Sequence, residues 1–255
     1  MTKNDEAFAA RLKTGEPIIG TWVKTPHPHV VEVLARTPLD VVVLDAEHAP
    51  FDRPTLDLCI LAARASGIPV LVRPQANDPA AILQALDGGA TGVVVPHIRN
   101  GEDAERAVRS CRYIPNGRGY AGSTRAAGYT TRSMADHRAA CETPLVIAQI
   151  EDRDALDDLE GIMSTNGLGG VFVGRADLAV SFGASSMDDA AVVEAVDRIC
   201  EQASRHGVPL GMFLSRVEDV SLWREKGATF FFLGSDQSFM LGGATALAQS
   251  VRAQF

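Results

Sequence analysis

The sequence predicts an α/β protein built as a single (β/α)₈ TIM barrel, and three observations lead to this fold class. Eight short apolar runs, most of them rich in β-branched residues, recur along the 255 residues, each with the length of a buried strand. A segment with a helical pattern follows each run, and this alternation in a chain of about this length is typical of the eight-stranded barrel. No glycine-rich phosphate-binding fingerprint follows the first run, which disfavours a doubly wound open sheet.

The elements are expected in strict alternation after a short amphipathic helix over 4–13, which Gly15 ends. Strands are expected over 18–23, 39–44, 69–72, 91–95, 145–150, 170–173, 209–214 and 229–233. Helices are expected from the loop at 24–28 to about 36, over 54–66, 79–87 and 102–111, from 151 to about 163, over 188–206 and 217–226, and from 235 onward. Proline and glycine mark many of these boundaries, as they do at most ends of helices and strands.

We expect one domain over residues 1–255, because no Pro/Gly/Ser-rich linker and no shift in composition divides the chain. One insertion-like segment, 113–143, is too long for a plain connection between a helix and a strand. It is either a surface loop or a segment that folds over the barrel mouth or onto a neighbouring subunit. The chain's only tyrosines, Tyr113, Tyr120 and Tyr129, lie in it and favour the second alternative.

Composition excludes several classes of partner. Lys plus Arg number 24 against 32 Asp plus Glu, and the net charge of -8 argues against nucleic acid and anionic membranes. The amino terminus is polar, and no apolar run reaches transmembrane length. The four cysteines are scattered, which fits reduced thiols and a cytoplasmic location; they are Cys59, Cys111, Cys141 and Cys200.

The stretch after the second expected strand carries the first sign of chemistry. An apolar run over 41–44 ends in Asp45, Glu47 and His48 and is closed by Pro50. Ionisable groups at the end of a buried parallel strand cost free energy unless they are paired or take part in the protein's function. For this strand alone, a charged loop that merely caps the strand is an equally good interpretation.

The same pattern recurs at other strand ends, which favours a site. The polar residues at these ends are His48, Arg73, His97, Gln149, Glu151 and Asp177. In a barrel they converge on one mouth, where catalytic residues lie. Glu151 and Asp177 follow adjacent strands, and two carboxylates with open water positions suit Mg²⁺ or Mn²⁺. Each acid could instead be a helix N-cap, although Glu is a weak cap.

The stretch Gly174–Asp177 opens a helix after the sixth expected strand. Free backbone N–H groups at such a position can hold a substrate carboxylate. Together with a metal and Arg73, which would stabilise an enolate, this stretch describes a site for an α-keto acid.

These stretches resemble the HpcH/HpaI family of metal-dependent pyruvate aldolases. The similar stretches are LDAEHAPFD (44–52), LVRP (71–74), GATGVVVPHI (89–98), RYIPNGRGYAG (112–122), AQIED (148–152) and GVFVGRADLAVSFG (170–183). They span most of the expected barrel and keep the family's order. The relatives of most interest act as 4-hydroxy-2-oxoheptanedioate aldolase or on 2-keto-3-deoxy sugar acids.

The resemblance implies roles for individual residues. Glu151 and Asp177 would bind the metal (Mg²⁺, Mn²⁺ or Co²⁺), with no organic cofactor. Arg73 would stabilise the transition state, and His48 would be the acid/base residue, made more basic by Asp87. The substrate contacts would come from Gln149, Gly174, Ala176 and Asp177. The family usually forms homohexamers, so the 113–143 segment would have a place at a subunit interface.

Three further residues have more than one interpretation. Where the family usually has proline, this chain has Arg175, which leaves the size and charge of the preferred substrate open. Lys24 follows the first expected strand and could form a Schiff base, but its polar neighbours offer no apolar pocket to depress its pKa. His97 is interpreted as a structural histidine, although it could line the pocket.

We therefore expect a class II aldolase that reversibly cleaves 4-hydroxy-2-oxo acids to an aldehyde and pyruvate, or a related 2-oxo acid such as hydroxypyruvate. The expected partners are these small molecules and further copies of the chain. A citramalyl- or malyl-CoA-type lyase on the same barrel is one alternative, but no basic run for CoA phosphates lies near the mouth. A catalytically silent binding barrel is the other alternative. It predicts that other residues replace the catalytic ones at the site positions, whereas here all the expected site residues are present.

Overall fold

Eight parallel strands close into a barrel in the computed structural model, which describes residues 2–140 and 144–255. The strands pair in chain order from β1 to β8, and β8 pairs with β1. They are β1 (Ile18–Val23), β2 (Val41–Asp45), β3 (Val70–Arg73), β4 (Gly92–Val95), β5 (Leu145–Ile150), β6 (Gly170–Val173), β7 (Leu210–Leu214) and β8 (Ala228–Ser235). The expected barrel and all of its expected strands are confirmed.

At least one helix lies between each pair of successive strands, and most of the helices surround the barrel. They are α1 (Lys3–Thr14), α2 (Pro28–Leu34), α3 (Arg53–Ser66), α4 (Pro79–Gly88), α5 (Gly101–Cys111), α6 (Met134–Ala140), α7 (Leu159–Met163), α8 (Arg175–Ser181), α9 (Ala190–His206), α10 (Val220–Glu225) and α11 (Asp236–Arg252), with 3₁₀ turns η1 (Arg153–Asp157) and η2 (Val217–Asp219). No helix in the described part of the chain is long and apolar enough to cross a membrane.

One expected helix, from 151 to about 163, is wrong. The chain forms η1 and then α7, and the two are separated at Asp158, whose backbone is not helical (φ -140°, ψ 40°). The Asp158 carboxylate accepts hydrogen bonds from the backbone N–H groups of Gly161 and Gly101. It thus caps α7 and ties it to α5, because an Asp side chain competes well for backbone donors at a helix start.

The apolar residues form two layers on either side of the strands. Inside the barrel, Trp22, Phe172, Phe230 and Phe232 pack with aliphatic side chains from the other strands, and α1 contributes Phe8 to this cluster. The larger cluster fills the space between the strands and the helices. The barrel interior is therefore a packed core.

Strand register sets which polar residues meet at the carboxyl ends. Asp45 of β2 lies opposite Arg73 of β3. Ile150 of β5 lies opposite Val173 of β6, so the next residues, Glu151 and Gly174, are neighbours. The sequence pattern places these residues at strand ends, and the register makes them contact.

The insertion-like segment 113–143 is ordered in its described part. Arg125 binds the Asp57 carboxylate of α3 and the Gly88 carbonyl at the end of α4, and Ala126 donates to the Asp87 carbonyl. Asp57 lies in the first half of α3 and Gly88 at the end of α4, so within one chain the segment packs across α3 and α4 on the outside of the barrel. Residues 141–143 lie outside the described residues.

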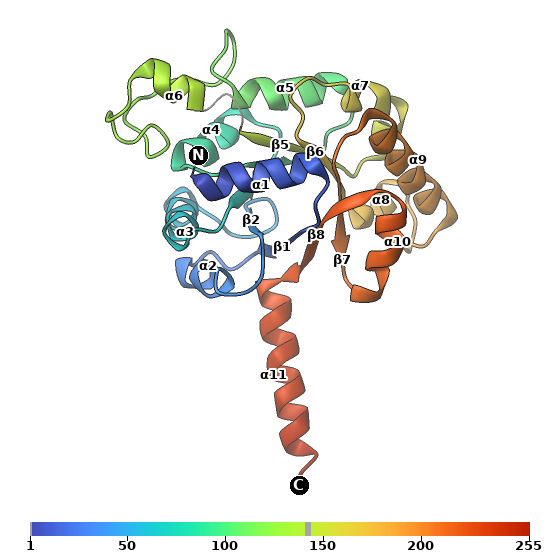
Figure 1. Ribbon diagram of the computed structural model, residues 1–255. Helices are drawn as coiled ribbons and strands as arrows, with labels where there is room; N and C mark the ends of the chain where they lie inside the picture. Colours follow the sequence, from blue (N-terminus) through green and yellow to red (C-terminus); the bar gives the residue numbers. More distant parts are fainter. Residues whose placement is uncertain (1, 141–143) are drawn as a thin grey trace.

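Helix α11 leaves the barrel wall and projects away from it, whereas most of the other helices surround the strands (Figure 1). Its residues are exposed after Asp236, and they include Leu241 at 73% and Leu247 at 72%. Ile19 on the outer face of β1 is 40% exposed, at a position that a barrel normally covers with a helix. The last helix thus forms as expected but does not cover its own barrel.

Candidate active site

A pocket of about 350 Å³ opens at the carboxyl ends of the strands. It is lined by most of the residues that the sequence placed at the site, namely His48, Arg73, Gln149, Gly174, Ala176 and Asp177. Trp22 and Phe172, from the top of the barrel core, also line it. In barrels, this end is where substrates bind.

Arg73 is buried at the base of this pocket and is held from several sides. Its Nη2 and Nε atoms lie 2.8 and 3.0 Å from the two oxygens of Asp45, and its Nε lies 3.2 Å from Oε2 of Glu47. The guanidinium carbon lies 4.3 Å from the centroid of the Trp22 ring. Arg73 is therefore fixed in position, which is what a group that stabilises developing charge requires.

The pKa values of the two acids around Arg73 shift in opposite directions. Burial opposes ionisation of Asp45, but Arg73 and the backbone N–H of His48 outweigh it, so the pKa of Asp45 is lowered. For Glu47, burial outweighs the attraction of Arg73 and the nearby histidines, and its pKa is raised. The positive charge of Arg73 thus stabilises mainly the ionised form of Asp45. The negative charge of Glu47 is only partly compensated.

Glu151 follows β5 and is only 2% exposed. Its Oε1 accepts a hydrogen bond of 2.9 Å from the backbone N–H of His97, and its Oε2 accepts one from the side-chain amide of Gln149. Burial raises the pKa of Glu151 despite these hydrogen bonds. The charge of a buried carboxylate of this kind is costly unless a further cation lies next to it.

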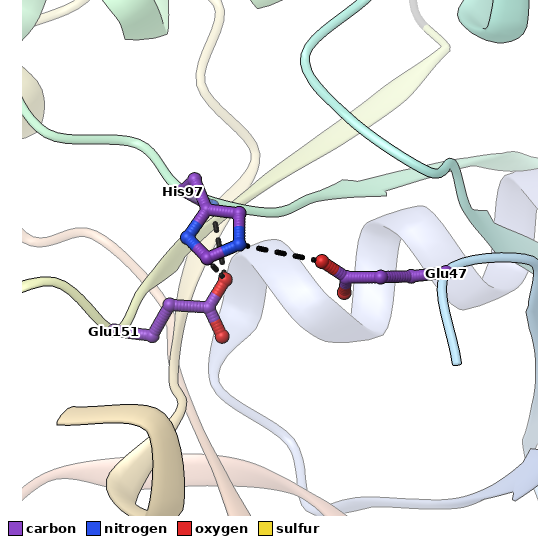
Figure 2. A group of neighbouring side chains, drawn as sticks. All are labelled: Glu47, His97 and Glu151. Atoms are coloured by element: carbon purple, nitrogen blue, oxygen red, sulfur yellow. Dashed lines mark hydrogen bonds and ion pairs between the residues drawn. The ribbon is translucent and has the colours of Figure 1, made fainter. Parts of the chain in front are cut away.

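His97 lies between Glu47 and Glu151, and Figure 2 shows the three side chains converging. Its Nε2 is 3.4 Å from Glu47 Oε1, and its Nδ1 is 3.6 Å from Glu151 Oε1 and 2.9 Å from Asp152 Oδ2. Burial lowers the pKa of His97, but the surrounding carboxylates outweigh it and raise the pKa. One ligand atom from each of Glu47, His97 and Glu151 lies within 4.8 Å of the others, so the group could hold a metal ion.

The donor set fits a hard divalent cation. Glu151 packs against Gly174: a Cβ added at Gly174 would lie 2.8 Å from Glu151 Oε2. Asp177 is exposed in the first turn of α8 and lines the same pocket. Carboxylate oxygens suit Mg²⁺ or Mn²⁺; of these two acids, Asp177 lines the pocket and Glu151 lies next to Gly174.

His48 and Asp87 are not brought together within the chain. His48 lines the pocket, half-exposed, with its Nε2 3.7 Å from Glu47 Oε2. Asp87 lies near the end of α4, where Arg118 binds its carboxylate, and it lines a different pocket. Because α4 runs back along the barrel, the two residues lie towards opposite ends of the strands.

Sequence reasoning did not single out Trp22, and it noted Glu47 only as one of several charged groups. A tryptophan in an apolar strand looks like a core residue, and nothing in the sequence indicates that its ring supports Arg73. For His97, which we expected to be structural, the informative feature is its left-handed backbone (φ 55°), rare for a residue with a side chain. Lys24 lines the pocket with its Nζ 3.4 Å from Asp45 Oδ2.

Known proteins that are similar in sequence to this chain are described as aldolases. Residues 18–241 match the family model described as HpcH/HpaI aldolase/citrate lyase. The chain is 34% identical over 246 residues to the 4-hydroxy-2-oxo-heptane-1,7-dioate aldolase of Klebsiella pneumoniae, covering 96% of this chain and 93% of the relative. It is 35% identical over 251 residues to the 5-keto-4-deoxy-D-glucarate aldolase of Escherichia coli O6:H1, covering 96% of both.

Solved structures show the same similarity. An HpcH/HpaI aldolase/citrate lyase family protein from Burkholderia cenocepacia superposes with a TM-score of 0.90 at 31% identity, covering 96% of this chain and 99% of that one. The citrate synthase SbnG superposes with a TM-score of 0.86 at 29% identity, covering 96% of this chain and 97% of that one. The whole barrel, and not only a part of it, is therefore shared with these proteins.

Proposed function

The chain belongs to the HpcH/HpaI aldolase/citrate lyase family, and we propose that it cleaves 4-hydroxy-2-oxo acids reversibly to an aldehyde and pyruvate, or a related 2-oxo acid such as hydroxypyruvate. Its relatives, named as aldolases and matched over nearly their full length, make it a carbon–carbon lyase. One observation carries the proposal: Gln149, which lines the pocket together with the fixed guanidinium of Arg73, donates its side-chain amide to the buried carboxylate of Glu151.

A divalent cation, Mg²⁺, Mn²⁺ or Co²⁺, would be held by Glu151 and Asp177, with Glu47 and His97 close by. When bound, it would polarise the 2-oxo group and stabilise negative charge on its oxygen. The buried position of Glu151 supports this assignment, because a nearby cation would compensate a carboxylate that burial makes hard to ionise.

The 2-oxo acid would bind with its carboxylate at the opening of α8. The backbone N–H groups of Ala176 and Asp177 lie in the first helical turn, where donors have no partner within the helix. Gly174 has no side chain, so the substrate can approach the backbone closely, and Gln149 would donate to or accept from the substrate beside it. These groups orient the substrate against Arg73.

Arg73 would stabilise the enolate that remains when the carbon–carbon bond breaks. Its bidentate pair with Asp45 and its position over Trp22 set the guanidinium before the reaction starts, which reduces the cost of reorganisation. In cleavage, the 4-hydroxyl would lose its proton to His48, a half-exposed imidazole that lines the pocket, and the aldehyde would leave. In the reverse direction, His48 returns the proton.

Asp87 would support His48 only where two copies of the chain meet, because within one chain it lies near the other end of the barrel. We propose that the protein forms a homo-oligomer, a hexamer by resemblance. The exposed α11 supports this proposal, since an isolated helix of 17 residues with large exposed apolar side chains is marginal in water. A second copy would cover both this helix and the outer face of β1.

We propose a cytoplasmic location for this enzyme. Three cysteines are buried free thiols, and burial raises the pKa of Cys59 and Cys200 to about 11 and that of Cys111 to about 12. Unreactive, unpaired thiols are typical of a reducing compartment. Cys141 lies outside the described residues.

A single assay tests the proposed reaction. Purified protein is incubated with pyruvate and a panel of aldehydes, with Mg²⁺, Mn²⁺ or Co²⁺ or with EDTA, and the products are identified by mass spectrometry. We expect condensation with metal and none with EDTA. Turnover of citramalyl- or malyl-CoA but not of free 4-hydroxy-2-oxo acids would contradict the proposal, and so would a borohydride-trapped adduct of pyruvate on Lys24.

A further inference from the structure

Glu47 is a buried acid that the proposed reaction does not use. Its side chain is 9% exposed, and its buried Oε2 accepts no hydrogen bond from any residue that the structure describes. Arg73 lies 3.2 Å from this oxygen, but its shorter contact is with Asp45, at 2.8 Å. The other oxygen, Oε1, points to the His97 ring (Figure 2). A buried carboxylate in this state costs free energy unless a further cation compensates its charge.

The two nitrogens of the His97 ring have different surroundings. Nδ1 lies 2.9 Å from Oδ2 of Asp152, at hydrogen-bond distance, and Arg99 Nε donates to the same oxygen at 3.1 Å. Nε2 lies 3.4 Å from Glu47 Oε1, which is longer than a good hydrogen bond. When Nδ1 carries the hydrogen and donates it in a hydrogen bond to Asp152, Nε2 keeps a free lone pair. A histidine that binds a metal commonly donates its other N–H to a carboxylate in this way, so the ring is oriented as a metal ligand.

The two oxygens of Glu151 face different partners. Oε2 accepts from the Gln149 side chain and lies 2.8 Å from the position of a Cβ added at Gly174, on the side where α8 begins. Oε1 accepts from the backbone N–H of His97 at 2.9 Å and lies 3.6 Å from Nδ1 of its ring. One carboxylate can therefore bind an ion beside Asp177 through Oε2 and contact a second ion through Oε1.

The spacing of these groups suits a metal ion. One ligand atom from each of Glu47, His97 and Glu151 lies within 4.8 Å of the other two. Ligand atoms that bind one Zn²⁺ at about 2.0–2.2 Å lie about 3–4 Å apart, so small side-chain rotations bring the three to binding distance. The two carboxylate side chains are 9% and 2% exposed, whereas that of His97 is 45% exposed. Water can therefore reach the ion as a fourth ligand.

Negative charge prevails around the His97 ring. Three carboxylates have an oxygen within 3.6 Å of a ring nitrogen, namely Glu47, Glu151 and Asp152. Two guanidinium groups adjoin them: Arg99 contacts Asp152 near the surface, and Glu47 shares Arg73 with Asp45. An ion bound by Glu151 and Asp177 would add no ligand contact to Glu47. A dication between Glu47 and His97 would therefore enter a site with uncompensated negative charge.

We infer that Glu47, His97 and Glu151 form a second metal site, which binds a transition-metal dication such as Zn²⁺ beside the ion proposed at Glu151 and Asp177. An imidazole nitrogen with carboxylate oxygens suits Zn²⁺ or Co²⁺, whereas Mg²⁺ prefers oxygen ligands alone. The second ion joins the ends of β2, β4 and β5, because each ligand follows one of these strands. It fixes the Glu151 carboxylate, and it requires no substrate, so the site does not depend on the proposed reaction.

Zinc stoichiometry distinguishes two sites from one. Metal-free protein is equilibrated by dialysis against Zn²⁺, and the bound zinc per chain is measured by mass spectrometry. We expect two ions in the native protein, and one each in His97→Asn and Asp177→Asn. Asparagine tolerates the left-handed backbone of residue 97 (φ 55°), so His97→Asn removes the imidazole with little strain. His29→Asn, a change in an exposed histidine, is the control and should bind two ions.

X-ray absorption identifies the ligands of the second ion. In Asp177→Asn, where only the second ion should remain, the zinc spectrum should show one imidazole nitrogen among oxygen ligands. Asp152→Asn should weaken binding of this ion by about tenfold, measured by calorimetry with Zn²⁺, since the outer carboxylate orients the ring. Asp154→Asn, a change in an exposed acid nearby in the sequence, should leave the affinity unchanged.

The variants also separate the second site from the proposed function. A single zinc ion that is lost in His97→Asn and kept in Asp177→Asn would leave the second site standing and remove the ion proposed at Asp177. A single zinc ion that is lost in Asp177→Asn and kept in His97→Asn would overturn the second site. An unchanged zinc content in His97→Asn, or a zinc spectrum without imidazole in Asp177→Asn, would overturn it as well.

Discussion

Arg73 and Asp45 form a bidentate ion pair at the base of the pocket, with N–O distances of 2.8 and 3.0 Å and both side chains buried. The register between β2 and β3 places the two residues opposite each other. A buried pair of this kind gains little net stability, but it fixes the position of a guanidinium that can act on substrate. The pair therefore links the strand register to the chemistry.

Arg73→Ala should lower kcat by about a hundredfold or more, because in the proposed mechanism the guanidinium contributes more to the enolate than to the bound substrate. Arg73→Lys should not fully restore kcat, since an ammonium group lacks the forked geometry that Asp45 orients. Steady-state kinetics with pyruvate and an aldehyde measure both. Arg106→Lys, a change in an exposed arginine of α5, is the control. Near-normal turnover in Arg73→Ala would place Arg73 outside the site.

Asp45→Asn should destabilise the protein in a way that depends on pH. The pKa of Asp45 is lowered in the folded protein, so its ionised form contributes stability above the unfolded value of about 3.9. This contribution is lost as the pH falls below about 4 towards the folded pKa. The difference in unfolding free energy between native protein and Asp45→Asn, measured with urea from pH 7 to pH 3, should therefore shrink at the acid end.

The exposed Asp154 supplies the control for this experiment. Asp154→Asn should unfold like the native protein at each pH. A difference between Asp45→Asn and the native protein that stays constant from pH 7 to pH 3 would show that the Asp45 charge does not stabilise the fold.

Much of the fold follows from the sequence, because the buried strands of a parallel barrel are apolar runs that polar ends and turn residues delimit. Arg73, Gln149 and Glu151 could be placed at one mouth for the same reason. The contact between Glu151 and Gly174 could not, since it depends on the register of β5 and β6. The hydrophobic periodicity of a sequence does not specify the register between two strands that are distant in the chain.

Other features lie beyond sequence patterns for different physical reasons. An apolar helix face looks the same whether it packs on its own barrel or on another copy, so the departure of α11 could not be predicted. The position of the His97 ring between two acids depends on a left-handed backbone in a loop. The sequence predicts that Asp87 lies near the end of a helix. The direction of α4 in the barrel then places Asp87 away from His48 within one chain.

The metal site can be dissected with four variants. Glu151→Gln and Asp177→Asn should each weaken Mn²⁺ binding by about tenfold or more, because each would remove a charged oxygen from the proposed ligand set. His97→Gln and Glu47→Gln should have smaller effects if these residues only surround the ion. Calorimetry with Mn²⁺ measures the affinities, with Asp154→Asn as control. Unchanged affinity in Asp177→Asn together with loss in His97→Gln would move the ion to the Glu47, His97 and Glu151 group.

Helix α11 should mediate assembly. Leu241→Glu and Leu247→Glu place charges on side chains that are now exposed, and in a monomer such changes alter stability little. If a second copy covers them, each change should shift the protein towards smaller species in light scattering coupled to size exclusion. Gln249→Glu changes a polar residue of the same helix and is the control. An unchanged mass in both leucine variants would exclude this helix from the interface.

Gly174→Ala should weaken the metal site through a purely steric effect. The backbone of Gly174 (φ -87°, ψ 76°) is in a region open to alanine, so the substitution brings no left-handed strain. The added Cβ would lie 2.8 Å from both Cβ and Oε2 of Glu151, which is closer than van der Waals contact permits. Glu151 is buried and must therefore move with its hydrogen bonds to Gln149 and to the His97 backbone.

We expect Mn²⁺ affinity to fall by about tenfold or more, together with a loss of stability of about 1–3 kcal/mol, the usual range for an overpacked site. Calorimetry and thermal unfolding measure the two effects separately. Gly119→Ala is the control, since nothing lies within 4 Å of the Cβ that it adds. Native Mn²⁺ affinity in Gly174→Ala would show that the position of the Glu151 carboxylate against β6 does not matter for the ion, and Glu151 would then lose its assignment as a ligand.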